Sequence, residues 1–193
     1  AQGPLLILEL EQLRGEALFD PLSLVQSMVH NMQTIHGSLA SCQTAAEQVR
    51  AVSGFDRVLV YRFLSDGAGE VVAESAAEGL EPYLGLRYPA SDIPRQAREL
   101  YLQNWLRIIP DAKYQPAPLH PDVNPFTSLP LDMSQLALRS VSPVHLEYLR
   151  NMGVRASMSL SLIVEGRLWG LIACHHASTH FLDHERRVTL ELF

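Results

Sequence analysis

Two pairs of β-type segments, each folded about a turn that contains glycine, constrain this chain more than any other feature. The first pair spans residues 58–74 around Asp66-Gly67, and the second spans residues 156–175 around Glu165-Gly166. Runs of β-branched and aromatic residues joined by such short turns are typical of β-hairpins. The sequence therefore predicts a sheet whose strands are mostly antiparallel.

Helical patterns precede the first hairpin. Asp20-Pro21 can cap and begin a helix with apolar residues at helical spacing, and Ser38 can cap a second stretch that ends near Gly54. Gly37 interrupts the pattern, so we expect one long helical segment with a kink at this position. Its apolar stripe packs either on the sheet of its own domain or against a second copy of the chain.

Three further helices and a long loop complete the predicted order of elements. Helices are expected from Gln96 to Leu102 after Pro94, from Pro143 to about Gly153, and after a cap at Asp183. A short strand at 107–109 precedes a Pro-rich loop at 110–134. Loops this long are usually functional or are pinned by a segment that passes them. This order predicts an α+β domain, with a central sheet flanked by helices.

Composition excludes several classes of protein. The 193 residues carry a net charge of −6 with scattered Lys and Arg, which argues against a nucleic-acid groove. No apolar run reaches the ~20 residues of a membrane helix, and no signal-peptide pattern opens the chain. We therefore expect a cytoplasmic location, without nucleic acid or membrane as a partner. Cys42 and Cys174 are far apart and are expected to be free thiols.

The run Tyr88-Pro89-Ala90-Ser91-Asp92-Ile93-Pro94 forms a proline-rich corner before a predicted helix. Pro94 biases Ile93 away from the helical region and so fixes the backbone. In one interpretation Ser91 or Asp92 simply caps the helix. In the other, the rigid corner presents a fixed carbonyl group to N–H donors of a ligand.

A second polar cluster surrounds the helix that begins at Pro143. It consists of Arg139, Ser140, Ser142, His145 and Tyr148. A helix N-terminus beside arginine and hydroxyl groups suits a carboxylate or a phosphate. The alternatives are surface salt bridges for the arginine and a structural role for the histidine.

Polar residues also alternate with apolar ones on the last two strands. Ser157, Ser159 and Ser161 share one face, which lines either a cavity or solvent. Cys174-His175-His176 offers zinc-type ligands, but Cys174 and His175 point to opposite faces of a strand, which disfavours a metal site and a Cys–His catalytic pair. The common nucleotide-binding and hydrolase motifs are missing as well. We therefore expect a ligand pocket.

Several longer segments together resemble the GAF domain of bacteriophytochromes. They are GFDRV at 54–58, the run at 88–94, LRS at 138–140, SPVHLEYLRNMG at 142–153 and WGLIACHH at 169–176. The resemblance covers nearly the whole chain. It implies that residues 1–18 are the last strand and linker of a PAS domain, and that residues 19–193 are a bilin-binding GAF domain with a long helix at its start.

The resemblance also implies a pocket on one face of the sheet that holds biliverdin IXα. The Asp92 carbonyl would accept from pyrrole N–H groups while its carboxylate faces a following domain. His145 would share a water network with the pyrroles, and His175 would bond the D-ring carbonyl. The other implied contacts are Tyr61, Tyr88 and Tyr148 around the D ring; Tyr101, Arg107, Arg139, Ser142, Ser157 and Ser159 at the propionates; and Ile93, Pro94 and Met152.

The attachment point departs from part of the family pattern. Plant and cyanobacterial phytochromes carry a Cys before the pocket His, where this chain has Val144. Bacteriophytochromes use a Cys near the start of the PAS domain, and Cys42 and Cys174 match neither place. We therefore expect either noncovalent binding or attachment through a cysteine N-terminal to this sequence.

By resemblance, the chain is a red/far-red photoreceptor domain that signals by D-ring Z/E isomerisation and is not itself an enzyme. PHY and histidine-kinase output domains are expected in the longer protein, and the GAF helices are expected to form a homodimer. The alternatives are an engineered near-infrared fluorescent protein, a GAF module that binds another small ligand or only dimerises, and a metalloenzyme. The retained Asp92 speaks against the fluorescent protein, because such variants commonly replace it.

Overall fold

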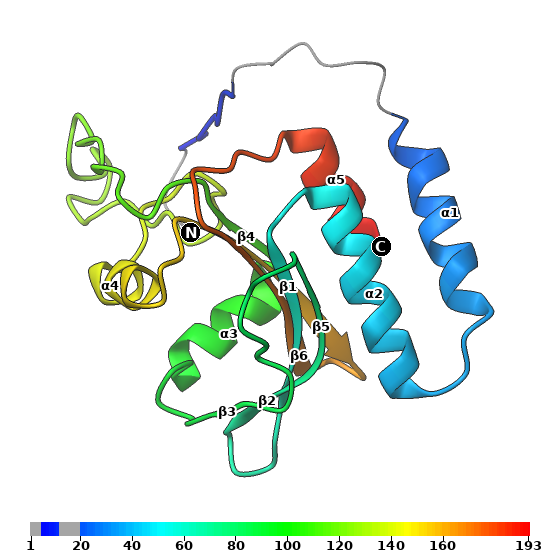
Figure 1. Ribbon diagram of the computed structural model, residues 1–193. Coiled ribbons are helices and arrows are strands. Elements are labelled where there is room, and N and C mark those ends of the chain that lie inside the picture. Colours follow the sequence, from blue (N-terminus) through cyan, green and yellow to red (C-terminus); the bar gives the residue numbers. More distant parts are fainter. Residues whose placement is uncertain (1–4, 12–19) are drawn as a thin grey trace.

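A six-stranded antiparallel sheet forms the centre of the molecule (Figure 1). The computed structural model describes residues 5–11 and 20–193. The strands are β1 Arg57–Phe63, β2 Gly69–Ala76, β3 Arg87–Tyr88, β4 Leu106–Ile109, β5 Ala156–Val164 and β6 Arg167–His176, in the spatial order β3-β2-β1-β6-β5-β4. The predicted α+β fold with an antiparallel sheet is confirmed.

Both predicted hairpins are present, and their turns explain why glycine is needed. Gly67 between β1 and β2 has φ of 84°, and Gly166 between β5 and β6 has φ of 73°. These values lie in the left-handed region, which glycine adopts without steric cost. The two hairpins meet in the middle of the sheet, where β1 pairs with β6. The two-residue strand β3 is too short to leave a periodic pattern, and sequence reasoning missed it.

Five helices lie on the two faces of the sheet (Figure 1). Three of them, α1 Pro21–Gln33, α2 Ser38–Ser53 and α5 His184–Leu192, cover one face. The other two, α3 Arg95–Gln103 and α4 Pro143–Asn151, lie on the opposite side with the long loop. The predicted caps Asp20 and Asp183 accept hydrogen bonds from the backbone N–H groups of Ser23 and Arg186.

The expectation of one long kinked helix at the start of the domain is wrong. Residues 34–37 separate α1 from α2, and the two helices fold back beside each other (Figure 1). Gly37 has φ of 104°, far from helical values, and it occupies the N-cap position expected for Ser38. Because glycine adopts such a conformation easily, the chain reverses direction where the sequence pattern indicated only a kink.

The largest core cluster lies between the sheet and helices α1, α2 and α5. It includes Val58 and Val60 of β1, Met158 of β5 and Cys174 of β6, all at most 1% exposed. Successive strand residues point to opposite faces, so the residues between them point toward α3 and α4. The thiol of Cys174 therefore lies on the opposite face of the sheet from His175, as the sequence predicted.

Residues 5–11 pass beside the long loop and are not part of the six-stranded sheet, and the predicted last strand of a PAS domain stays a prediction. Side-chain contacts, rather than hydrogen bonds between paired strands, connect this segment to the rest of the domain. The Glu9 carboxylate accepts from the backbone N–H groups of Ala137 at 3.1 Å and Leu138 at 2.7 Å. Glu11 forms an ion pair with Arg187. The predicted PAS tail otherwise lies outside the described residues.

The long loop runs without a helix or a named strand from Ile109 to Pro143, eight residues beyond its predicted end near 134. An isolated bridge joins Val123 to Pro130 within it. Among the described residues, no helix is long and apolar enough to cross a membrane.

Candidate functional site

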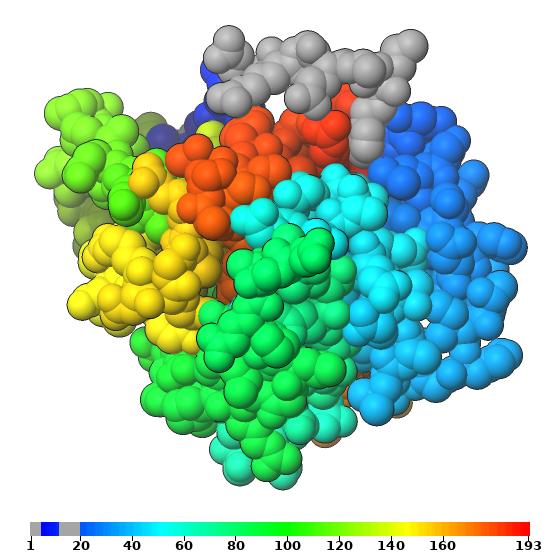
Figure 2. All heavy atoms as spheres, in the orientation of Figure 1, coloured from blue at the N-terminus to red at the C-terminus, as the bar shows by residue number. Residues whose placement is uncertain are grey.

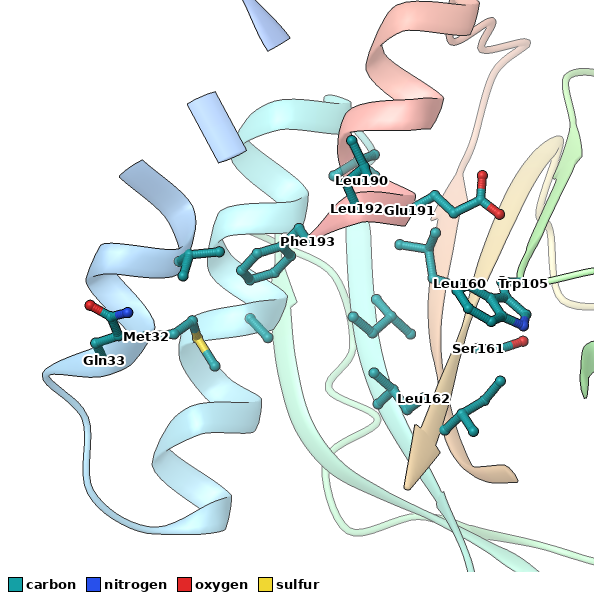
Figure 3. Close-up of a pocket in the computed structure, with 14 residues that line it drawn as sticks. Met32, Gln33, Trp105, Leu160, Ser161, Leu162, Leu190, Glu191, Leu192 and Phe193 are labelled. Carbon is teal, nitrogen blue, oxygen red and sulfur yellow. The ribbon is translucent and has the colours of Figure 1, made fainter. Parts of the chain in front are cut away.

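Two cavities among the described residues have similar volumes but different chemistry. The first, which we call the apolar cavity, has a volume of about 700 Å³ and borders α1, α5 and β5 (Figure 3). Met32, Leu160, Leu190 and Phe193 belong to its wall. The polar groups among its lining side chains are those of Gln33, Ser161 and Glu191 and the indole N–H of Trp105, which already donates to the Leu102 carbonyl. This cavity offers few groups that could orient a ligand.

The second cavity, which we call the site cavity, has a volume of about 650 Å³ and lies between the sheet, α3 and α4. Every site residue predicted from the sequence lines it. These residues are Tyr61, Tyr88, Asp92, Ile93, Pro94, Tyr101, Arg107, Arg139, Ser142, His145, Tyr148, Met152, Ser157, Ser159 and His175. Segments up to 114 residues apart, from Tyr61 to His175, thus converge on one space.

The sheet forms the floor of the site cavity through alternate strand residues. Leu59 and Tyr61 project from β1, Ser157 and Ser159 from β5, and His175 from β6. The Tyr61 ring lies directly over Gly69 of β2, because a Cβ atom built on Gly69 would come within 1.7 Å of its ring carbon. A glycine at this position is therefore required for the Tyr61 ring to occupy its place.

The proline-rich corner does not cap the helix that follows it. Pro94 occupies the N-cap position of α3, and no side chain makes a cap hydrogen bond there. The Asp92 N–H donates to the Pro89 carbonyl at 3.1 Å, which closes a tight turn. The capping interpretation of Ser91 and Asp92 is therefore wrong, and both side chains line the site cavity instead.

Arg98 holds this corner, and sequence reasoning missed it. Its guanidinium donates to the carbonyl oxygens of Ile93, Ala90 and Gly67, the first at 2.8 Å. It also lies 4.5 Å from the centre of the Phe63 ring. One side chain thus connects α3, the corner and the β1–β2 turn. The only sequence signal was an arginine early in a short helix, which is common in surface helices.

Two arginines give one end of the site cavity a positive charge. Arg107 donates to the Ser140 carbonyl at 3.3 Å, and its buried Nη1 atom has no acceptor among the described residues. Burial and the nearby Arg139 lower the pKa of Arg107 to about 10. Both guanidinium groups still carry charge near neutral pH, so this end of the cavity suits an anion with several oxygens.

Two histidines lie deeper in the site cavity. His145 stacks on Tyr148 with ring centres 6.3 Å apart, and burial together with Arg107 lowers its pKa. Burial, then Arg57 and His145, lower the pKa of His175 to about 4. The buried Nδ1 of His175 has no hydrogen-bond partner in the described part of the chain. Both imidazoles are therefore neutral near pH 7, and His175 has a free polar atom for a ligand.

Aromatic rings gather on the side of the site cavity formed by β1 and β3. Tyr61 lies 6.0 Å from Tyr88 and 5.4 Å from Phe63, measured between ring centres. Burial raises the pKa of Tyr61, Tyr88 and Tyr148, the last to about 12, and the Asp92 charge adds to each effect. Asp92 is the only acid among the residues that line the cavity. These phenols therefore stay protonated and can donate hydrogen bonds.

The structure offers no support for a metal centre. Within the described ranges, no group of three or more His, Cys, Asp or Glu side chains could hold an ion. Cys174 is fully buried on the other face of the sheet, and burial raises the pKa of its thiol. Cys42 lies on α2 and does not line the site cavity. Val144 lines the cavity at its surface and is 76% exposed.

Sequence reasoning missed several other lining residues, most of them apolar. They include Leu59, Val71, Gln96, Ala97, Leu100, Asn104, Ile109, Leu149, Leu171 and Ala173. Strand alternation was a usable signal for some of them, because Leu171 and Ala173 share a face with His175. No local signal marked the α3 residues, because only the tertiary fold turns α3 toward the sheet.

Comparisons with known proteins agree with this geometry. A family model described as "GAF domain" matches residues 39–193. The chain is 52% identical over 190 residues to "Cyanobacterial phytochrome B" of Nostoc sp., covering 97% of this chain and 25% of that protein. It is 49% identical over 168 residues to the "Bacteriophytochrome" of Pseudomonas aeruginosa, covering 87% and 23%.

A solved structure gives the same result for the fold. The chromophore-binding domain of an unusual bacteriophytochrome from R. palustris matches with a TM-score of 0.85 and 45% identity, covering 89% of this chain and 56% of that one. The chain spans about a quarter of the length of the curated relatives it matches.

Proposed function

The chain belongs to the GAF domain family, as the chromophore-binding domain of a phytochrome, and we propose that it holds biliverdin IXα and senses red and far-red light. The observation that carries this proposal is the convergence of the predicted pocket residues on one cavity of about 650 Å³. That volume lies within the roughly 300–1,000 Å³ of typical small-molecule sites. The similarity to phytochromes and to a chromophore-binding domain supports a bilin as the class of ligand.

The chemistry of the two ends of the cavity supports a bilin with two propionates. Arg107 and Arg139, with hydroxyls from Ser157 and Ser159, supply donors for carboxylates at one end. Tyr61 and Tyr88 line the side of the cavity formed by β1 and β3, where a flat, partly polar ring can lie, and His175 lies on the floor opposite Ser157. The buried Nη1 of Arg107 and Nδ1 of His175, which have no partner among the described residues, fit such a ligand.

In this proposal, Asp92 has two roles. Its carbonyl, fixed by the turn at Pro89 and by Arg98, accepts from the pyrrole N–H groups. Its carboxylate is exposed at the mouth of the site cavity and is free to contact a following domain. His145 contacts the pyrroles from the α4 side, and Ile93, Pro94 and Met152 supply apolar contacts.

The bilin, when bound, supplies light absorption and Z/E isomerisation at the D ring. The protein residues His175, Tyr61 and Tyr88 then lose or exchange hydrogen bonds and ring contacts, and Asp92 transmits the change. We propose that the signal passes through a PHY domain to a histidine kinase in the longer protein. The domain itself acts as a sensor rather than an enzyme.

We further propose a homodimer through the helices on the opposite face. Leu22 and Val29 of α1 are 67% and 37% exposed, and Leu192 of α5 is 68% exposed. Figure 2 shows α1 at the edge of the molecule. Scattering and size-exclusion measurements at several concentrations test this, and a monomer at all of them contradicts it.

Mixing the protein with biliverdin tests the ligand directly. A red absorption band that changes after red illumination is expected. A spectrum identical to that of free biliverdin would overturn the proposal. The same titration with cyclic nucleotides as competitors separates a bilin site from a GAF module for another ligand, since a bilin site is not emptied by them.

Zinc-enhanced bilin fluorescence on a denaturing gel tests attachment. Because Val144 stands at the position where other phytochromes carry cysteine, we expect no covalent adduct with this chain alone. A fluorescent band would assign attachment to Cys42 or Cys174, against their positions outside the site cavity.

Asp92→His tests the role of the corner. The variant should keep the pigment but lose photoconversion and gain fluorescence, because the carboxylate that receives the change is missing. Asp66→His, in the exposed β1–β2 turn, is the matched control and should photoconvert normally. Normal photoconversion in Asp92→His would contradict the assigned role.

A further inference from the structure

A buried charged cluster lies next to the site cavity, and neither the predicted contacts nor the lining residues include it. Arg57 of β1 and Glu74 of β2 form an ion pair at 3.2 Å with side chains that are 7% and 6% exposed. Buried charges of this kind need partners, because removal from water is costly. The partners of these two side chains show what the pair holds in place.

The first partner is the chain between β2 and β3. The Glu74 carboxylate accepts from the backbone N–H groups of Tyr83 at 2.7 Å and Leu84 at 2.9 Å. The Arg57 guanidinium donates to the Glu81 carbonyl and lies 3.6 Å from the centre of the Tyr83 ring. Residues 81–84 are thus fixed on the ion pair, just before Tyr88 enters the site cavity.

His175 lies on the neighbouring strand β6, in register with Arg57 of β1, so the two are paired residues. Arg57 alternates along β1 with Leu59 and Tyr61, which line the site cavity, so its side chain leaves the sheet on the same face. Side chains of directly paired residues lie about 4.5–5.5 Å apart at Cβ. Arg57 thus places a cationic side chain in register with an imidazole whose Nδ1 has no partner among the described residues.

We propose that Arg57, held by Glu74, is a positioning residue for His175: the ion pair keeps a cation on β1 in register with the imidazole on β6, and it also holds residues 81–84 ahead of Tyr88. Ligand contact with Arg57 is not required, because Arg57 does not line the cavity. The direction of the pKa shift at His175, which Arg57 lowers in addition to burial, agrees with this role.

Other polar and charged groups lie on the elements around the cavity and the ion pair. They are Glu74 on β2, Tyr88 on β3, Asp92 before α3, Arg107 on β4, His145 and Tyr148 on α4, and Ser157 opposite His175 on β5. His145 also lowers the pKa of His175, so the experiment must separate the two histidines.

Nitrogen-15 NMR of the histidine rings, in the chain without bilin, provides the test. His175→Gln and His145→Gln assign the two signals. Arg57→Gln removes the cation and leaves Glu74 without its partner. It should raise the midpoint pH of His175 protonation by at least about one unit, which is a tenfold change in the protonation equilibrium. The double variant Arg57→Gln with Glu74→Gln should raise it less. Glu74→Gln alone should not raise it, because the cation remains.

This order of effects distinguishes a charge effect from a structural one. If the ion pair only maintained the fold, Arg57→Gln and Glu74→Gln would move the transition alike, since each breaks the pair. Equal shifts, or an unchanged transition in Arg57→Gln, overturn the proposal. If Arg57→Gln fails to fold, Arg57→Lys and Glu74→Gln provide the test instead. Both variants keep a cation at position 57, so a raised midpoint pH of His175 protonation in either one contradicts the charge effect.

Amide hydrogen exchange tests the second half of the proposal. In Glu74→Gln the amides of Tyr83 and Leu84 lose a charged acceptor and should exchange at least about tenfold faster. In Arg57→Lys they should stay protected. Unchanged exchange in Glu74→Gln overturns the role of the pair in holding residues 81–84.

The relevance of this arrangement to pigment rests on the proposed function. With biliverdin bound, the pH-dependent change of the red absorption band should occur at a higher pH in Arg57→Gln than in the unmodified chain. An identical pH dependence in the two proteins would contradict a role of Arg57 in the pigment-bound state. A chain that forms no red band at all overturns the proposed function, whereas the NMR titration without bilin still decides the role of Arg57.

Discussion

On β5, Met158 and Leu160 point toward the helices, whereas Ser157 and Ser159 between them point into the site cavity. On β6, Cys174 and His175 divide in the same way. The first face is packed against α1, α2 and α5 and contains no ion pair among the residues of its core cluster. The second meets only α3, α4 and loops, and its polar atoms are partly unsatisfied by the described residues. One sheet thus separates the part that stabilises the fold from the part that binds.

The difference has a physical cause. Three helices cover the first face, namely α1 with 13 residues, α2 with 16 and α5 with nine, and their apolar residues pack densely on the sheet. The second face is covered by two nine-residue helices and a loop of more than thirty residues, which fill it incompletely. A cavity remains there, and the polar side chains at its wall are available to a ligand.

The largest expected effect is on the packed face. Met158→Ala should lower the free energy of unfolding by about 2–5 kcal/mol, because it opens a cavity at a site that is 1% exposed. Folded Met158→Ala should bind biliverdin with unchanged affinity. Urea denaturation and pigment titration measure the two quantities. Met152→Ala, at the wall of the site cavity, is the matched comparison and should show the reverse pattern.

The second effect is a pH dependence confined to the cavity face. The pKa of His175 falls from 6.5 to about 4 on folding, so between these values the unfolded chain binds a proton that the folded chain does not. The free energy of unfolding should therefore decrease as the pH falls through this window, by up to about 1.4 kcal/mol per pH unit. His145 contributes with the same sign.

His175→Gln should reduce the slope of the unfolding free energy against pH. His30→Gln, on the exposed side of α1, is the control and should leave this slope unchanged. Urea midpoints at several pH values give the measurement. A slope that is equal in both variants would show that the cavity histidines are not responsible.

The third effect concerns ligand affinity. Arg139→Leu should weaken biliverdin binding about tenfold to a hundredfold, since it removes a charge-assisted hydrogen bond worth about 1.5–3 kcal/mol. Arg150→Leu, on an exposed position of α4 outside the cavity, is the control. Equal affinities for the two variants would place the propionates elsewhere.

The smallest effect is expected at the floor of the site cavity. Ser159→Ala should reduce biliverdin affinity a few-fold, corresponding to one neutral hydrogen bond of about 0.5–1.5 kcal/mol. The free energy of unfolding of Ser159→Ala should fall much less than that of Met158→Ala. Ser65→Ala in the exposed β1–β2 turn should change neither. A large stability loss in Ser159→Ala would mean that both faces contribute alike to folding.

Sequence reasoning was accurate where a signal is local. The two hairpins, the caps Asp20 and Asp183, and the opposite orientations of Cys174 and His175 all follow from side-chain period and turn chemistry. It was wrong about the kinked helix at Gly37, because a reversal of the chain depends on contacts with distant parts of the molecule. The identity of the pocket residues came from long motifs rather than from spacing.

By itself the sequence determined which residue types alternate along each strand, because alternation is a property of the extended backbone. It also determined that Asp92 sits in a corner stiffened by prolines. Only the tertiary structure decided that this corner is held by Arg98 and not by capping, and that Arg57, Glu74 and His175 lie together. These contacts join β1, β2, α3 and β6, and no local pattern records which strands become neighbours.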